Sequence, residues 1–249
     1  MENKYKKYFE LVGKEWHDHK IGTYHVSAVG NSHADIDPQE HYGPCLRSTY
    51  WDYLDPVEND EKSEGNFKMG DFLHEIAEAN YKKNHPNSVN EFPIVLKISK
   101  DVTIKGSIDI IDFDDKIVLD FKSSSMFTFP SSEYDYNETY LSQVRIYTAL
   151  LEYWIIKDTY FKPEKLRVVY IKKHNLETVE LDILYDWEEV AEAYGDFLER
   201  VKYLDNCLRN KKEPEAEPHK WCKFCPRLEK CVEQKDIIEI KKGKYVLND

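Results

Sequence analysis

Two runs rich in β-branched and aromatic residues, separated by a short acidic junction, constrain this chain more than any other feature. The runs are Gly106–Phe113 and Lys116–Lys122, and the junction is the pair Asp114-Asp115. Such runs around a two-residue polar loop predict an antiparallel β-hairpin. Counting back from that loop along both strands places Asp109 directly opposite Asp120.

This pairing predicts a site for a divalent cation. Directly paired residues in antiparallel strands hold their Cβ atoms roughly 4.5–5.5 Å apart on one face. Two carboxylates that close repel each other unless a cation lies between them, and carboxylate oxygens suit Mg²⁺ and Mn²⁺. Lys122, two residues beyond Asp120, faces the same side of the sheet.

These groups suit phosphodiester hydrolysis. A metal ion polarises a phosphoryl oxygen and lowers the pKa of water, while a lysine orients that water or offsets negative charge. The alternative is an ordinary solvated strand face. Asp120 follows the apolar run Ile117–Leu119, which argues against that alternative.

The rest of the chain alternates between helical and extended patterns. Apolar residues at helical spacing predict four helices, over Leu46–Leu54, Phe67–Lys83, Tyr140–Ile156 and Trp187–Arg209. Further strands are expected over Phe92–Ile98, Leu166–Lys172 and Thr178–Ile183, while the first hairpin strand begins near Val102. We expect partial helix in residues 1–25, a loop over 30–45, and another loop over Ser123–Asn137. The order predicts the α/β class, with a mixed sheet flanked by helices.

Composition bounds the class of protein. Of the 249 residues, 41% are hydrophobic and 33% charged, a globular balance. No apolar run approaches the roughly 18 residues that a membrane span requires, and the N-terminus is polar, so we expect a cytoplasmic protein with no membrane partner. The net charge of −12 argues against a broadly basic surface, although a DNA groove needs only local basicity.

Gly106, Asp109, Asp120 and Lys122, in this order and spacing, resemble the PD-(D/E)XK nuclease superfamily. The resemblance implies a restriction-endonuclease-like fold. Two further elements are similar to the RecB-like branch. Gly70–His74 resembles its Gly-x-x-x-His element, which implies that His74 binds the metal together with Asp109, Asp120 and the Phe121 carbonyl. Taken alone, His74 is more typical of a core histidine.

Gln143 and Tyr147 resemble the Gln-x-x-x-Tyr element of the same branch. Their i, i+4 spacing places them on one helix face. The resemblance implies that this face points at the metal site and contacts DNA or Lys122, so both are counted among the catalytic residues. Without it, the pair indicates only a polar stripe on a helix.

The chain has five cysteines, an odd number that fits a metal site plus one spare better than a set of disulfides. Cys222, Cys225 and Cys231 lie near the C-terminus and Cys45 far upstream. This arrangement resembles the single-cluster nucleases of the branch, namely the CRISPR-associated exonucleases and AddB-type nuclease domains. It implies a 4Fe–4S cluster that joins the two ends, although the spacing alone also suits zinc. Cys207 is interpreted as a packed bystander.

The resemblance implies three regions, an N-terminal helical segment with the first cluster cysteine (1–65), a nuclease core (66–185) and a C-terminal helix with the cysteine-rich segment (186–249). It implies an Mg²⁺- or Mn²⁺-dependent exonuclease acting on single-stranded DNA or DNA ends. Recombination, phage DNA processing and CRISPR adaptation, with their proteins as partners, suit such an enzyme. Two alternatives stay open: a non-catalytic DNA-binding or assembly subunit, and a cluster-based redox sensor.

Overall fold

A computed structural model describes residues 20–31, 44–57, 61–126, 128–132, 137–151, 155–156, 159–217, 222–233, 237–241 and 244–247. For 61–63, 155–156, 159–160, 237–241 and 244–247 it describes the backbone alone. No helix in these ranges combines the length and the apolar composition of a membrane span.

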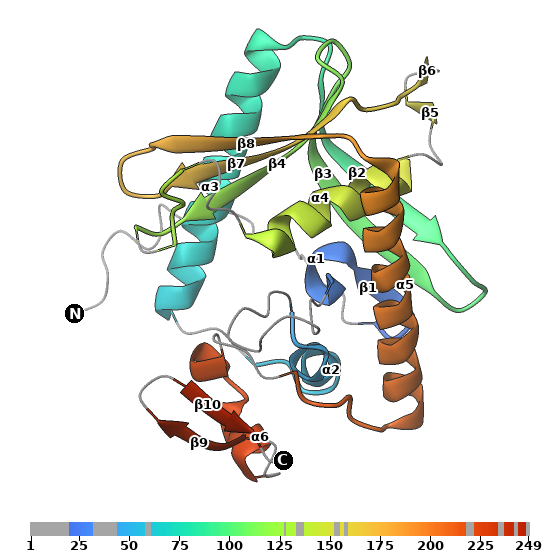
Figure 1. Ribbon diagram of the computed structural model, residues 1–249, viewed down its shortest axis with the longest axis vertical. Coiled ribbons are helices and arrows are strands. Elements are labelled where there is room, and N and C mark those ends of the chain that lie inside the picture. The colour runs from blue at the N-terminus through green and yellow to red at the C-terminus, as the bar shows by residue number, and fades with distance from the viewer. Residues whose placement is uncertain are drawn as a thin grey trace.

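A mixed sheet forms the centre of the molecule, with helices on both faces, as the sequence predicts (Figure 1). Its six described strands run in the order β1-β3-β4-β7-β8, with β2 also paired to β3. The strands are β1 (Thr23–His25), β2 (Val89–Lys97), β3 (Thr103–Asp112), β4 (Ile117–Ser124), β7 (Lys165–Lys172) and β8 (Thr178–Leu184). The pairs β1–β3 and β4–β7 are parallel, and the other neighbours are antiparallel.

The helices form two layers around this sheet. On one face lie α1 (Val26–Val29), α2 (Leu46–Leu54), α4 (Glu138–Leu151) and α5 (Trp187–Asn210), with the larger apolar core beneath them. On the other lies α3 (Glu61–Asn84), which packs Leu73 on the smaller cluster of Ile110, Leu119 and Phe121. Asp186 caps α5 by accepting hydrogen bonds from the backbone N–H groups of Glu188 and Glu189.

The C-terminal segment follows α5 and adds small elements. A 3-10 turn (Cys222–Phe224) precedes α6 (Leu228–Glu233) and a hairpin of β9 (Ile237–Lys241) and β10 (Lys244–Leu247). In Figure 1 this segment lies at the opposite end of the molecule from the β3–β4 turn, beside α2. The hairpin was not predicted from the sequence.

The predicted pairing of β3 with β4 is confirmed. The observed pairs are Ile110↔Leu119, Ile111↔Val118 and Asp112↔Ile117, which is the register that the residue count gives. The connecting turn is longer than predicted, because the ladder ends at Asp112 instead of Phe113. The buried Asp112 carboxylate accepts hydrogen bonds from the N–H groups of Asp114 and Asp115, at 2.9 and 3.1 Å, and thereby closes a wider turn.

Residues 23–25 form strand β1, because they pair with Thr103–Lys105. The partial helix expected within residues 1–25 stays a prediction, since residues 1–19 lie outside the described ranges. Two other predictions were wrong in part. Helix α4 ends at Leu151 instead of Ile156, and the β-branched Ile155–Ile156 forms a two-residue strand, β5, that pairs with β6 (Thr159–Tyr160). Helix α3 begins at Glu61, six residues before Phe67.

Candidate active site

The site is built at a break in the sheet along strand β3. One edge of β3 pairs with β2 along most of its length. On the other edge β1 pairs with Thr103–Lys105 and β4 pairs with Ile110–Asp112. The stretch between them, Gly106–Asp109, has no strand partner on that edge among the described residues. We call this stretch the notch.

Asp109 lies where the strand changes face. Ile104, Ile108 and Ile111 all belong to the larger core cluster, whereas Ile110 belongs to the cluster under α3. In a regular strand, residues two positions apart face the same side of the sheet. Ile108 and Ile110 face opposite sides, so the alternation is broken between them. On β2 the residue opposite Asp109 is Glu91, whose φ of 47° is in the left-handed region. The distortion on both strands turns the Asp109 carboxylate into the notch.

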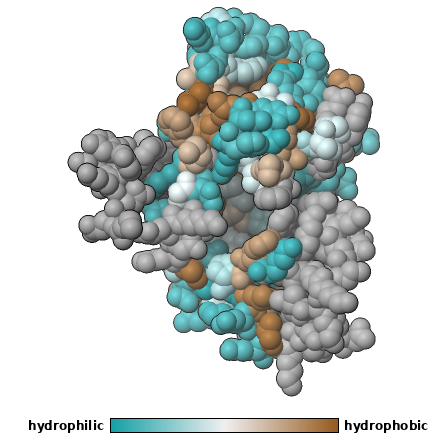
Figure 2. Space-filling model, turned by 90° about the vertical axis from the view of Figure 1, so that its left-hand side faces the viewer, coloured by the Kyte–Doolittle hydropathy of each residue, from teal (hydrophilic) through white to brown (hydrophobic). Residues whose placement is uncertain are grey.

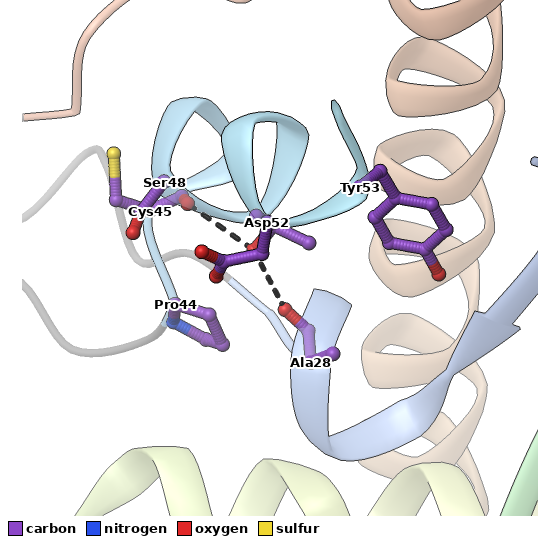
Figure 3. A pocket seen from close by; sticks show the side chains of 7 residues that line it. Ala28, Pro44, Cys45, Ser48, Asp52 and Tyr53 are labelled. Atoms are coloured by element: carbon purple, nitrogen blue, oxygen red, sulfur yellow. Dashed lines mark hydrogen bonds between the residues drawn. The ribbon is translucent and has the colours of Figure 1, made fainter. Parts of the chain in front are cut away.

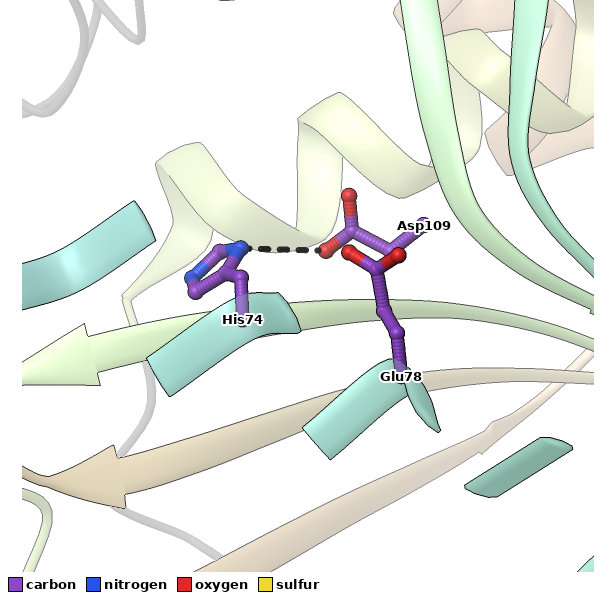
Figure 4. Close-up of side chains that lie close together, drawn as sticks. All are labelled: His74, Glu78 and Asp109. Atoms are coloured by element: carbon purple, nitrogen blue, oxygen red, sulfur yellow. Dashed lines mark ion pairs between the residues drawn. The ribbon is translucent and has the colours of Figure 1, made fainter. Parts of the chain in front are cut away.

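The Asp109 carboxylate joins strand β4 to helix α3. Its Oδ2 accepts a hydrogen bond from the Phe121 N–H at 2.7 Å, so a side chain replaces the ladder bond that is missing there. From α3, His74 Nδ1 lies 3.6 Å from the same oxygen. Glu78, one turn further along α3, brings its carboxylate to the same place, and one ligand atom from each of His74, Glu78 and Asp109 lies within 4.8 Å of the others (Figure 4).

Asp120 and Lys122 project from β4 as a buried ion pair. Lys122 Nζ lies 2.6 Å from Asp120 Oδ2. Burial raises the pKa of Asp120 to about 6, and the Asp109 carboxylate adds to this effect against the Lys122 charge. Burial alone would lower the pKa of Lys122, but the Asp120 and Asp109 carboxylates outweigh it and raise that pKa. Lys122 therefore stays an ammonium at neutral pH.

Helix α4 covers this pair with a polar face. Gln143 Nε2 donates a hydrogen bond to the Tyr147 hydroxyl at 3.2 Å. Burial, reinforced by the Asp120 carboxylate, raises the pKa of Tyr147, so the phenol keeps its proton. Tyr140, one turn before Gln143, places its ring under the Lys122 ammonium at 5.2 Å from Nζ to the ring centroid.

The residues around the notch fit a divalent cation. The buried Asp120 carboxylate pairs with the Lys122 ammonium through Oδ2. His74, Glu78 and Asp109 offer an imidazole nitrogen and two carboxylate oxygens within 4.8 Å of one another, which is a donor set for Mg²⁺ or Mn²⁺. Of the residues predicted as ligands, His74 and Asp109 belong to this group, whereas Asp120 is not in it and pairs with Lys122. Phe121, the fourth, contributes its backbone N–H to Asp109.

Two residues of this site escaped the sequence analysis. Glu78 lies four residues after His74, a spacing that places both on one face of a helix, so the signal was present in the sequence. Tyr140 lies three residues before Gln143 and could have been found by extending the same helix face by one turn. Both belong to stretches whose pattern predicts no more than an ordinary helix.

Comparison with known proteins identifies the family. Residues 88–232, which are 145 of the 249 residues, match the family model of the PD-(D/E)XK nuclease superfamily. The chain belongs to this superfamily. No curated protein matches the sequence. Among solved structures, the crystal structure of SSO0001 is 20% identical with a TM-score of 0.49, covering 91% of each chain. A phage-related exonuclease from Haemophilus somnus 129PT is 13% identical with a TM-score of 0.46, covering 67% of this chain and 82% of that one.

In this PD-(D/E)XK protein the segments that carry the predicted cluster cysteines contact one another. Cys45 immediately precedes α2, and residues distant in the sequence form hydrogen bonds with the backbone on both sides of it. Arg200 NH2 donates to the Pro44 carbonyl at 2.6 Å, and the Leu46 N–H donates to Glu217 at 2.6 Å. Arg200 and Glu217 also pair with each other.

A second contact ties α2 to the cysteine-rich segment. The buried Arg227, between Cys225 and Cys231, lies 3.2 Å from Asp52 of α2. None of the five cysteines forms a disulfide, and cysteine thiolates are a donor set that suits a metal cluster. Three cysteine sulfurs within 4.8 Å of one another, as a single tetrahedral zinc ion requires, do not occur in the described part of the chain. Cys207, on α5, is packed in the larger core cluster, as predicted.

A cavity of about 280 Å³ lies beside Cys45. Its lining comes from α1, from the residues before α2 and from α2 itself, and includes Ala28, Asp52 and Tyr53 (Figure 3). It contains none of the residues of the notch. At the end of β7, Lys172 pairs with Glu177, and Lys173 donates a hydrogen bond to the Asn66 carbonyl, so both lysines have local partners. In the view of Figure 2, hydrophobic side chains lie among hydrophilic ones in both the upper and the lower half of the molecule.

Proposed function

We propose that this protein is an Mg²⁺- or Mn²⁺-dependent deoxyribonuclease that hydrolyses phosphodiester bonds, as an exonuclease on single-stranded DNA or DNA ends. One observation carries the proposal. The Asp109 carboxylate, which lies at the notch, meets His74 and Glu78 of α3, and the next strand, β4, carries the Asp120–Lys122 ion pair.

The roles of the residues follow from their charges. His74, Glu78, Asp109, Asp120 and the Phe121 carbonyl are the candidate ligands of the cation, which when bound supplies Lewis acidity toward a phosphoryl oxygen. Lys122 remains an ammonium, so it positions the attacking water and offsets the negative charge that builds on the phosphate, without removing a proton itself. Water attacks phosphorus as the bond to the leaving oxygen breaks; the water oxygen and one of its protons stay on the product phosphate, and the other proton passes to the leaving oxygen.

Tyr147 and Gln143 act as fixed hydrogen-bonding groups. The Tyr147 hydroxyl accepts a hydrogen bond from Gln143, which leaves its own proton free to donate to a phosphate oxygen. Because the pKa of Tyr147 is raised, this donor is present throughout the neutral pH range. In the segment that follows β4, Phe129 lies beneath the Lys172 ammonium.

We also propose that Cys45, Cys222, Cys225 and Cys231 hold a 4Fe–4S cluster. Two observations support this. None of the four cysteines forms a disulfide, and the segments that carry them are tied together by Arg200, Glu217 and Arg227. The cluster would act as a structural staple between the N-terminal segment (1–65) and the C-terminal one (186–249), around a nuclease core of 66–185. Recombination, phage DNA processing or CRISPR adaptation would supply the DNA ends.

One set of assays tests these proposals. Full-length protein is purified without oxygen, and cleavage of end-labelled single-stranded and duplex DNA is followed with Mn²⁺ or Mg²⁺. The Lys122→Ala variant should lose activity about 100-fold or more, whereas Lys165→Ala, which removes an exposed lysine of β7, should behave like wild type. Circular DNA should resist cleavage if the enzyme requires an end.

Each contrary result has a distinct meaning. Activity that survives Lys122→Ala refutes the mechanism. A wild-type protein that binds both DNAs and cleaves neither indicates a non-catalytic subunit. A protein without iron and without visible absorption refutes the cluster. A protein activity that changes when the cluster is oxidised, but not when the divalent cation is removed, indicates a redox sensor.

A further inference from the structure

Gly106 lies in the notch, three residues before Asp109, and its backbone does not require glycine. It pairs regularly with Ile94 of β2, and its φ is not in the left-handed region. The reason for glycine is therefore space. A Cβ atom at this position would lie 2.7 Å from Cε1 of the Tyr147 ring, and 3.4 and 3.5 Å from the hydroxyl oxygen and Cζ of the same ring.

The Tyr147 ring has little room to retreat. Its side chain is 4% exposed, and its neighbours on α4, Val144, Ile146 and Leu150, are fully buried in the same core cluster. Gly70, in α3, provides a contrast. A Cβ there would meet the Ser123 hydroxyl at 2.9 Å, and a hydroxyl at the end of a small half-buried side chain can rotate away. A packed aromatic ring cannot, because interiors tolerate added volume poorly.

The position of the ring decides where its hydroxyl lies. With the ring packed against the strand at Gly106, the hydroxyl accepts the Gln143 hydrogen bond and sits within electrostatic reach of Asp120 and Lys122. We propose that Gly106 is a positioning residue, the seat that allows the Tyr147 ring to approach β3 and so aims the Tyr147 hydroxyl and the Gln143 amide at the reacting phosphate.

This inference rests on the proposed nuclease function for its catalytic consequence, but not for its structural one. In Gly106→Ala the ring has to withdraw from 2.7 Å to an ordinary contact beyond 3.4 Å, a shift of about 0.7 Å or more. Since a displacement of about 1 Å can cost roughly 100-fold in rate, we expect kcat for DNA cleavage to fall about 10- to 100-fold, with KM changed much less.

The first test is a cycle in kcat with a matched glycine control. Gly195→Ala, on the exposed side of α5 where a Cβ meets no atom within 4 Å, should leave kcat unchanged. In a Tyr147→Phe background, which lacks the hydroxyl, Gly106→Ala should lower kcat by less than about threefold, because the group it displaces is already gone. A Gly106→Ala enzyme as active as Gly195→Ala refutes the inference, and so does an equal loss in both backgrounds.

The second test is a cycle in thermal stability, which needs no activity. Gly106→Ala should lower Tm in the wild-type background and in Tyr147→Phe, because both keep the ring. In a Tyr147→Ala background, which lacks the ring, Gly106→Ala should produce no further drop. A further drop in Tm in the Tyr147→Ala background refutes the proposal that Gly106 makes room for the Tyr147 ring. If the wild-type protein cleaves no DNA, the proposed function fails, while this cycle still decides whether Gly106 seats Tyr147.

Discussion

The raised pKa of Asp120 predicts an unusual dependence of stability on pH, which the Asp120→Asn variant exposes. Without a divalent cation, Asp120 titrates near pH 6 in the folded protein and near its ordinary value of 3.8 when unfolded. A carboxyl group with a raised folded pKa binds its proton more tightly in the folded state. Its contribution to stability is therefore fully present below the unfolded pKa and is lost as pH rises through about 6.

The magnitude follows from the size of that shift. About two pKa units correspond to about 3 kcal/mol in total, of which roughly half falls between pH 5 and pH 8. Asn resembles the protonated acid at every pH. The free energy of unfolding of wild type, minus that of Asp120→Asn, should thus fall by about 1 to 2 kcal/mol between pH 5 and pH 8.

Urea denaturation at pH 5, 6, 7 and 8 in the presence of EDTA measures this difference. Adding Mn²⁺ at pH 8 should reverse its sign in favour of wild type, since a ligand that binds only the folded state stabilises it. A difference between the two proteins that is independent of pH, or one that grows toward pH 8 in EDTA, would show that the burial of Asp120 does not control its ionisation.

Three further predictions concern residues around the site and the chain ends. Glu78→Gln should weaken Mn²⁺ binding, measured by calorimetry, about 10-fold or more. The control Glu75→Gln, on the exposed side of the same helix, should leave the affinity unchanged. Equal affinities of the two variants for Mn²⁺ would exclude Glu78 as a ligand. Arg200→Ala should lower the free energy of unfolding by about 3 kcal/mol, because it leaves the half-buried Glu217 without its charge partner. The control Arg209→Ala removes an exposed arginine and should cost less than about 1 kcal/mol. Similar losses in the two variants would contradict the role of Arg200 in holding the backbone around Cys45. Asp186→Ala should cost about 1 kcal/mol in urea denaturation through loss of the α5 cap, and a Ser at the same position should restore most of it.

Local patterns predicted the elements well where one physical rule acted alone. The helix predicted around Leu46–Leu54 is present. The strands β7 and β8 were predicted to within one residue at each end, because alternating runs bounded by polar residues have few other solutions. The β3–β4 register followed for the same reason, since the side-chain period of two leaves little freedom to slip.

Tertiary contacts decided the points where the predictions failed. Thr23–His25 becomes a strand only because β3 offers an edge, and three residues carry too little pattern to reveal it. The sequence likewise contains no sign that Gly106 has to admit a tyrosine ring, because Tyr147 is brought there by α4.

The sequence by itself determined that Asp109 and Asp120 share a register and that Lys122 faces the same way. It could not determine how the carboxylates are used. In the fold, β1 and β4 divide one edge of β3 between them, so the ladder stops short of the Asp109–Asp120 pair. Asp109 is freed to meet His74 and Glu78, while Asp120 turns to Lys122. Because β1 and β4 come from different parts of the chain, no local sequence pattern shows how they share this edge of β3.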